Sequence, residues 1–272
     1  MLFTTTKAHK RILESYNLNK PIHVINEGVD PNLYNTEKVS KLIETNKYTY
    51  LLVGKNETRK NTNKVMTAFI QSMQYKNVAL ICHTYNFLHG ATEHYKNWYN
   101  INLLTLGYKY IEETDYHIKF SNSFSDIYYT KPILDSTQMK SLYHSANVGI
   151  SCSSAEGWGL PEMEMMACGV PVIISNSIGH SEYLENIPVY TDLIIEPNGS
   201  EIAFDKIHFL GNVGEWSVIN ISDISEKLEY TYNNNIGQEL SQELSNYIIK
   251  NYNWNDIAKQ IKNILLGVND EK

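Results

Sequence analysis

The sequence lacks the long apolar runs and the cysteine framework that would place it in several common protein classes. No stretch approaches the roughly 20 apolar residues that a transmembrane helix needs, and the first residues lack the hydrophobic core of a signal peptide. The three cysteines, Cys82, Cys152 and Cys168, lie in apolar segments and fit no metal-binding spacing. They therefore predict buried free thiols, a reducing compartment and a cytoplasmic protein.

The sequence also has fewer basic than acidic residues: 23 lysines and arginines against 30 aspartates and glutamates give a net charge of −7. That balance argues against an extended nucleic-acid-binding surface, so we expect no nucleic-acid partner. The sequence has neither internal repeats nor long low-complexity tracts. At 272 residues, with 42% hydrophobic and 19% charged residues, the chain can form one large or two small globular domains.

Short apolar runs rich in β-branched residues alternate with longer amphipathic stretches, the pattern of a parallel sheet with helices on both faces. The predicted strands are residues 23–26, 49–53, 78–82, 117–120, 148–152, 170–174, 188–190 and 193–195. The predicted helices are residues 7–16, 36–45, 60–72, a stretch within 92–106, 137–145, 161–168, 180–184, 224–233, 237–251 and 254–266. This order predicts an α/β fold with a doubly wound parallel sheet, Rossmann-like, whose ligand lies at the carboxyl ends of the strands.

The most informative segment is residues 153–172, SSAEGWGLPEMEMMACGVPV. It places Glu156 in a loop of small residues, sets Pro161 where a helix can begin, and ends that helix at Gly169 before an apolar strand. Glu164 follows early in the helix. Free N–H groups and the positive end of the helix dipole make an anion site at the helix start. Two acids beside an anion site suit a ligand with both hydroxyls and phosphates, such as a nucleotide sugar.

A plainer interpretation of the acids in this helix stays open. The helix dipole alone favours acidic residues in a first turn, so Glu162 needs no further explanation.

The whole segment resembles the donor-site signature of the retaining glycosyltransferases of the GT-B fold, the group 1 or family 4 class. That signature has two glutamates separated by seven residues around Glu-Gly-aromatic-Gly-Leu-Pro, which correspond here to Glu156 and Glu164. Three more segments are similar to family elements: HVINEGVD at 23–30, LVGK with RKN at 52–55 and 59–61, and YNWN at 252–255. The resemblance covers residues 20 to 266.

The resemblance implies the C-terminal, donor-binding half of a GT-B fold. Residues 1–18 are similar to the last strand and helix of the acceptor-binding first half, so we interpret them as a remnant of that domain or a linker from it. Residues 19–272 would form the Rossmann-like domain that binds a nucleotide sugar. The acceptor domain would be an upstream segment or a separate polypeptide, unless the protein works without one.

The resemblance also assigns roles to charged side chains. Lys55 and Lys60 stand where the family has the Arg and Lys that hold the diphosphate, and Lys55 departs from the pattern because a point charge replaces a planar fork. Arg59 could supply that fork. Glu156 matches the acid nearest the reacting carbon of the sugar, and Glu164 matches the acid that accepts hydrogen bonds from the ribose.

A second set of residues would bind the donor with their backbone groups or by contact with the nucleotide base. These residues are Gly54, Lys131, Ile133, Gly157, Trp158, Gly159 and Leu160. The backbone N–H groups of residues 158–160 would line the phosphate and sugar pocket, and the two loop glycines would let the main chain approach the ligand. Lys131 and Ile133 would contact the base. Trp158 replaces the more usual Phe or Tyr, and packing beneath the loop is a sufficient explanation for it.

Family membership would imply an enzyme that transfers a sugar from a nucleoside diphosphate sugar to a glycan or other hydroxyl acceptor, with retention and without a metal. The alternative is a nucleotide-sugar-binding module or subunit, catalytically silent until it pairs with an acceptor-binding domain. A donor site that contains both acids and Lys60 is expected in either case.

Overall fold

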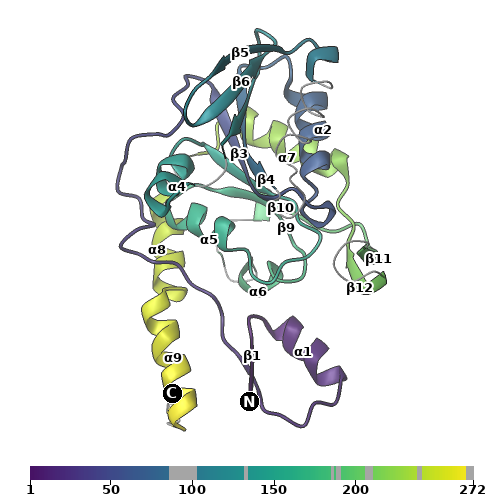
Figure 1. The fold of residues 1–272 in the computed structure, drawn as a ribbon, viewed down its shortest axis with the longest axis vertical. Coiled ribbons are helices and arrows are strands. Elements are labelled where there is room, and N and C mark those ends of the chain that lie inside the picture. The colour runs from purple at the N-terminus through teal and green to yellow at the C-terminus, as the bar shows by residue number, and fades with distance from the viewer. Residues whose placement is uncertain are drawn as a thin grey trace.

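A computed structural model describes residues 1–85, 103–131, 134–184, 187, 191–205, 211–237 and 241–267. Its centre is an eight-stranded sheet with the order β10-β9-β8-β3-β4-β7-β6-β5 (Figure 1). The strands are β3 (Tyr48–Lys55), β4 (Val78–Tyr85), β5 (Lys109–Glu113), β6 (His117–Ser121), β7 (Asp126–Thr130), β8 (Val148–Ser151), β9 (Val172–Ser175) and β10 (Ile194–Ile195). Neighbours from β10 to β7 pair in parallel, while β6 and β5 extend the sheet antiparallel at one edge.

Helices cover both faces of this sheet, as the strand–helix alternation predicts. Figure 1 shows α2 (Thr62–Met73) and α7 (Ile221–Asn233) on one side, and α4 (Ser136–Tyr143), α5 (Leu160–Ala167) and α8 (Ser241–Asn251) on the other. Side chains of β3 alternate between the two layers because successive residues of a strand point to opposite faces. Tyr50 packs in the core beneath α2 and α7, whereas Leu51 packs in the core beneath α4 and α5. The predicted doubly wound α/β fold is confirmed.

The strand order places a topological switch point at β3. From β3 the chain continues through β4 and β7 on one side of the sheet, and then returns to place β8, β9 and β10 on the other side. The loops that follow β3 and β8 therefore leave the sheet side by side and in opposite directions. Ligands of open α/β sheets bind in the crevice that such a divergence creates at the carboxyl ends of the strands.

The remaining elements lie outside the large sheet. A parallel pair, β1 (Leu2–Thr4) and β2 (Ile22–Val24), flanks α1 (Lys7–Ser15), and we call residues 1–24 the N-terminal unit. The last helix, α9 (Trp254–Leu266), runs toward the same end of the molecule, where both chain termini lie (Figure 1). Near the sheet rim are η1 (Thr58–Lys60), α6 (Ser181–Leu184), η3 (Thr191–Leu193) and a hairpin of β11 (Ser200–Asp205) and β12 (Gly211–Ser217).

One predicted helix, residues 36–45, is wrong, because that segment has neither helical nor strand structure. Its backbone is held by α4 and the residues after it: Leu42 N–H donates to the Ser141 carbonyl at 3.1 Å, and Ile43 N–H donates to Ser145 Oγ at 3.1 Å. Ile43 is buried in the core. Tertiary packing has thus overridden a local helical pattern. The predicted strand 188–190 and most of the helical stretch 92–106 lie outside the described residues.

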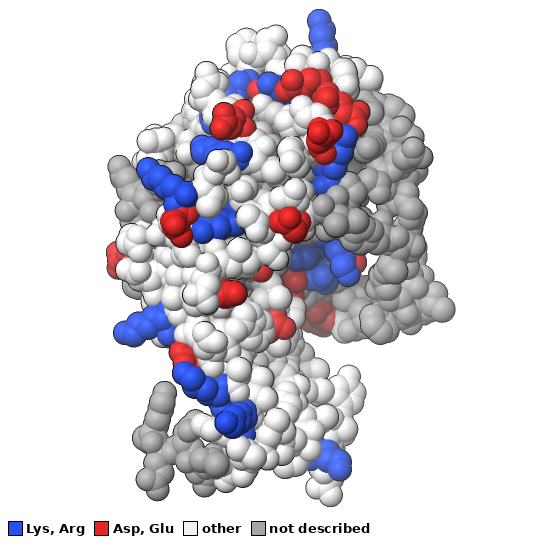
Figure 2. All heavy atoms as spheres, turned by 60° about the vertical axis from the view of Figure 1, so that its left-hand side comes forward, with Lys and Arg blue, Asp and Glu red and all other residues white. Residues whose placement is uncertain are grey.

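Surface and core features agree with the composition. The three cysteines are buried and free, as predicted. Among the described residues, no helix combines the length and apolarity needed to cross a membrane. On the face drawn in Figure 2, basic and acidic side chains are interspersed over the described surface.

Candidate donor-binding site

Glu156 lies in the loop after β8, on the crevice side of the sheet, and its backbone is fixed by the loop after β9. Glu156 N–H donates to the Ile178 carbonyl at 2.8 Å, and Ala155 forms a parallel bridge with the same residue. Gly179 adopts φ +98°, and a Cβ atom there would lie 2.8 Å from the Glu156 carbonyl carbon. The second loop can therefore approach Glu156 only because residue 179 is a glycine.

Two cations from the loop after β3 meet the Glu156 carboxylate. Lys60 Nζ lies 2.6 Å from Oε1 of Glu156, and an Arg59 guanidinium nitrogen lies 2.9 Å from the same oxygen. The side chains of Lys60 and Glu156 are 11% and 8% exposed, so this ion pair is largely desolvated. Lys60 extends across Gly54, where its Cε lies 3.5 Å from the position that a Cβ would occupy. The structure thus brings together four residues that the sequence singled out, Gly54, Arg59, Lys60 and Glu156.

The electrostatics of this cluster follow from its geometry. Burial alone would raise the pKa of the Glu156 carboxyl, but the positive charges of Lys60 and Arg59 outweigh burial and hold that pKa well below its ordinary value. Glu156 is therefore a carboxylate at neutral pH. The two cations are drawn together by it, and they form a compact positive centre beside a fixed negative charge.

This low pKa predicts an acid-sensitive contribution to stability. A carboxyl whose pKa is lower in the folded state stabilises the fold above its unfolded pKa, and that contribution is lost as the pH falls through the folded pKa. We expect the wild type to lose about 1 to 3 kcal/mol more than Glu156→Gln when denaturant unfolding is compared at pH 6 and pH 3. Equal losses in the two proteins would contradict the ion pair.

Helix α5 starts beside this cluster, and it has the proline in its first turn and the glycine after its end that the sequence predicts. Gly159 is its N-cap with φ +103°, and the chain leaves the helix through Gly169 with φ +77°. Trp158 is buried beneath the loop, with its ring centroid 5.2 Å from that of Tyr183 and 5.6 Å from that of Tyr252. The expectation that Trp158 packs under the loop is confirmed.

Glu164 lies further along α5, in an environment of tyrosines. It follows Glu162 by two residues, which is about 200° around the helix. Tyr143 Oη donates to Glu164 Oε2 at 2.5 Å, and Tyr34 also hydrogen-bonds this carboxyl. Burial raises the pKa of Glu164, and the hydrogen bonds from the two tyrosines oppose that shift in part. Glu164 therefore forms its own polar site on another side of α5 from Glu162.

A family model for glycosyl transferases group 1 matches residues 34–210, more than half of the chain. The chain belongs to this family. It is also similar to a protein of Sulfolobus islandicus filamentous virus (isolate Iceland/Hveragerdi) named glycosyltransferase 48, with 39% identity over 64 residues. That match covers 23% of this chain and 21% of the viral protein.

Solved structures resemble this group 1 chain in fold. Anabaena Alr3699/HepE in complex with UDP and glucose aligns with a TM-score of 0.69 at 14% identity, over 98% of this chain and 63% of that one. Sucrose-phosphate synthase from Thermosynechococcus elongatus aligns with a TM-score of 0.66 at 15% identity, over 98% of this chain and 57% of that one. The chain therefore spans about three fifths of the length of these two proteins.

For the other residues that the sequence assigns to the donor site, the role in donor binding stays a prediction. Lys55 ends β3 and its side chain is 63% exposed, with Nζ 4.0 Å from Glu57 Oε1. Lys131 follows β7 at the carboxyl rim, but its ammonium pairs with Glu113 at 3.0 Å. Ile133 lies outside the described residues. Gly157 and Leu160 lie in the loop and at the first position of α5.

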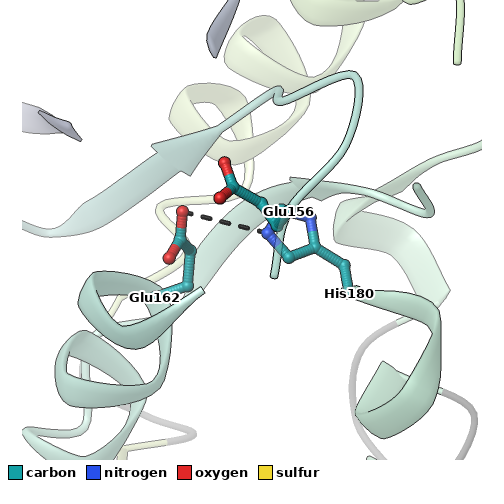
Figure 3. A group of neighbouring side chains, drawn as sticks. All are labelled: Glu156, Glu162 and His180. Atoms are coloured by element: carbon teal, nitrogen blue, oxygen red, sulfur yellow. Dashed lines mark ion pairs between the residues drawn. The ribbon is translucent and has the colours of Figure 1, made fainter. Parts of the chain in front are cut away.

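The group 1 signature did not single out two residues that the structure places under the loop. Glu162 and His180 are fully buried, and their ligand atoms lie within 4.8 Å of one another and of Glu156. Figure 3 shows the three side chains converging from the loop, from α5 and from the start of α6. Two carboxylates and an imidazole also suit a divalent cation. We do not assign a metal site, because Lys60 and Arg59 already neutralise Glu156.

The N-terminal unit of this group 1 chain contacts the same loop. Thr5 Oγ1 donates to the Gly157 carbonyl at 2.6 Å, and Lys7 N–H at the start of α1 donates to Glu182 Oε2 at 2.9 Å. Asn26 Nδ2 in turn donates to the Thr5 carbonyl at 2.8 Å. The unit is thereby tied to two residues of the sheet rim, one beside Glu156 and one in α6.

Proposed function

We propose that this chain is the donor-binding half of a retaining, metal-independent glycosyltransferase that uses a nucleoside diphosphate sugar and a glycan or other hydroxyl acceptor. The observation that carries the proposal is the ion pair of Lys60 with Glu156, joined by Arg59, at the switch point of a parallel sheet. Membership in group 1 supports it, and so does the similarity to Anabaena Alr3699/HepE, whose solved complex contains UDP and glucose.

The cluster is suited to the departure of a diphosphate. Negative charge grows on the leaving group as the bond to the sugar breaks, and fixed cations stabilise that charge without reorganising. Lys60 and Arg59 are held in place by Glu156 before any ligand arrives, and a diphosphate that binds beside Glu156 would share both of them. Two preorganised side-chain cations would then supply the charge stabilisation that a divalent metal supplies elsewhere. Glu156, kept anionic, would face the sugar.

The experiment that tests this function is calorimetry of UDP, GDP, ADP and TDP with the purified chain. We expect one nucleoside diphosphate to bind, and Glu164→Ala to weaken its affinity by about tenfold or more, because a buried hydrogen bond to ribose contributes about 1.5 to 3 kcal/mol. Glu14→Ala is the matched control, since Glu14 lies on α1 and is 53% exposed. Unchanged affinity in Glu164→Ala would remove the ribose assignment, and no binding of any nucleotide would overturn the donor site.

A second candidate function is a nucleotide-sugar-binding module that acts only with a partner domain. The N-terminal unit favours it, because parallel strands are normally covered on both faces, whereas β1 and its neighbourhood leave Met1, Phe3 and Tyr16 exposed. We expect the isolated chain to bind nucleotide sugar with negligible transfer to a sugar acceptor. Robust turnover by the pure chain would exclude this second function.

A further inference from the structure

Glu162 and His180 present only hydrogen-bond acceptors to each other. His180 Nδ1 lies 3.0 Å from the Ser175 carbonyl, which can only accept, so Nδ1 carries the proton. In a neutral imidazole Nε2 is then a lone pair. Ser151 Oγ donates to Glu162 Oε1, which lies 3.9 Å from His180 Nε2 (Figure 3). Glu162 Oε2 and His180 Nε2 are buried and have no hydrogen-bond partner among the described residues.

Such an arrangement is costly unless something positive lies between the two groups. Both side chains are fully buried, and an unpaired carboxylate is strongly disfavoured in a low-dielectric interior. The charged groups that face the pair are Glu156 and Lys60. Lys60 contacts Glu156, so among the residues that the structure describes the pair has no cation of its own. A proton is the smallest charge that removes the conflict, and it needs no entry path.

We propose that Glu162 and His180 hold one proton between them at neutral pH and act together as positioning residues under the donor loop. A small rotation of either side chain that closes the gap to about 2.8 Å would create the hydrogen bond. Burial lowers the pKa of His180, although Glu162 and Glu156 oppose that shift.

The pair can position the loop because the backbone of Gly159 rests on it. A Cβ at Gly159 would lie 2.9 Å from Glu162 Oε2 and 3.0 Å from His180 Nε2. His180 also belongs to the loop whose Ile178 carbonyl holds Glu156 and whose Gly179 packs against it. A bond between the two side chains thus joins the start of α5 to the support of Glu156. This role in donor binding rests on the proposed function, whereas the shared proton does not.

The shared proton is tested by comparing the folding equilibrium of wild type and Glu162→Gln in denaturant from pH 6.0 to 7.5. The amide can donate to His180 and accept from Ser151, so the variant needs no proton. The folded wild type holds one proton that the folded variant lacks, whereas His180 titrates alike in the two unfolded chains. The folding constant of the wild type should therefore fall by about tenfold per pH unit relative to that of the variant. Parallel pH profiles would overturn the proposal, as would stoichiometric Zn²⁺ binding that Glu162→Gln abolishes.

If Glu162→Gln does not fold, His180→Gln replaces it at the upper end of this pH range, because its amide can donate to a charged Glu162. Near pH 7.5 His180 has lost its proton in the unfolded wild type, so the two slopes again differ by close to tenfold per pH unit. The positioning role is tested separately by UDP calorimetry. We expect Glu162→Leu to bind UDP about tenfold more weakly and Glu162→Gln to restore binding to within about twofold of wild type. Equal affinity in all three proteins, or equal losses in both variants, would contradict positioning. If wild type binds no nucleotide, the proposed function fails, and the pH comparison still decides on the proton.

Discussion

Replacing Lys60 with alanine is expected to weaken binding of the nucleoside diphosphate of the proposed donor, with UDP as the probe, by about 30- to 100-fold. A charge-assisted hydrogen bond to a phosphate oxygen contributes about 2 to 3 kcal/mol when it is shielded from water, and the Lys60 side chain is only 11% exposed. The substitution also leaves Glu156 with Arg59 as its remaining cation partner, so negative charge near the diphosphate is less well compensated. Calorimetry at fixed ionic strength measures the change.

The matched control for this prediction is Lys259→Ala. Lys259 lies on α9, is 73% exposed and pairs with Asp256 one turn away. The Lys259→Ala substitution removes the same formal charge from the chain at a site away from the crevice. We therefore expect its UDP affinity to be within about twofold of wild type. A Lys60→Ala variant that binds UDP as well as Lys259→Ala would place the diphosphate elsewhere on the protein.

Gly179→Ala is expected to have the largest effect on stability, a loss of about 3 to 5 kcal/mol in the free energy of unfolding. Two costs add at this position. An L residue at φ +98° pays about 1 to 2 kcal/mol in backbone strain. The new Cβ would also lie 2.8 Å from the carbonyl carbon of Glu156, which is backbone and cannot rotate away. Denaturant unfolding measures the loss, and weakened UDP binding should accompany it.

Gly199→Ala separates the backbone strain from the steric contact. Gly199 has nearly the same backbone angle, φ +96°, and a Cβ there would meet nothing within 4 Å. We therefore expect a loss of about 1 to 2 kcal/mol from strain alone, with UDP binding unchanged. If the two variants are destabilised equally, the close approach of the residue 179 loop to Glu156 does not exist in solution.

Much of the fold follows from local patterns, and the failures have identifiable causes. The strand at 148–151 lies in a short apolar run and the helix at 254–266 is amphipathic, and the sequence predicts both almost to the residue. The segment 36–45 has a helical pattern of its own, but Ile43 is buried in the core and its backbone is bound by Ser145. The sequence does not predict β7, because DIYYT is short and begins with an aspartate, so it lacks the apolar run of the other parallel strands.

The candidate site likewise contains residues that the sequence predicts and residues that only the structure shows. Glu156 and Lys60 could be predicted because they belong to a motif, and the fold brings them into contact. Glu162 could not be recognised, since the helix dipole explains an acid in a first turn without any partner. His180 is 18 residues further on, at the start of a four-residue helix. Only the packing of α5 against that loop shows that two polar side chains share one buried space.

The hydrogen bonds of the N-terminal unit have a mechanical consequence. Thr5 donates to the Gly157 carbonyl and Lys7 N–H donates to Glu182, so the first residues of the chain are hydrogen-bonded to the loop of Glu156 and to α6. Because Gly157 is the residue after Glu156, an outward displacement of this unit would disturb the peptide next to that carboxylate.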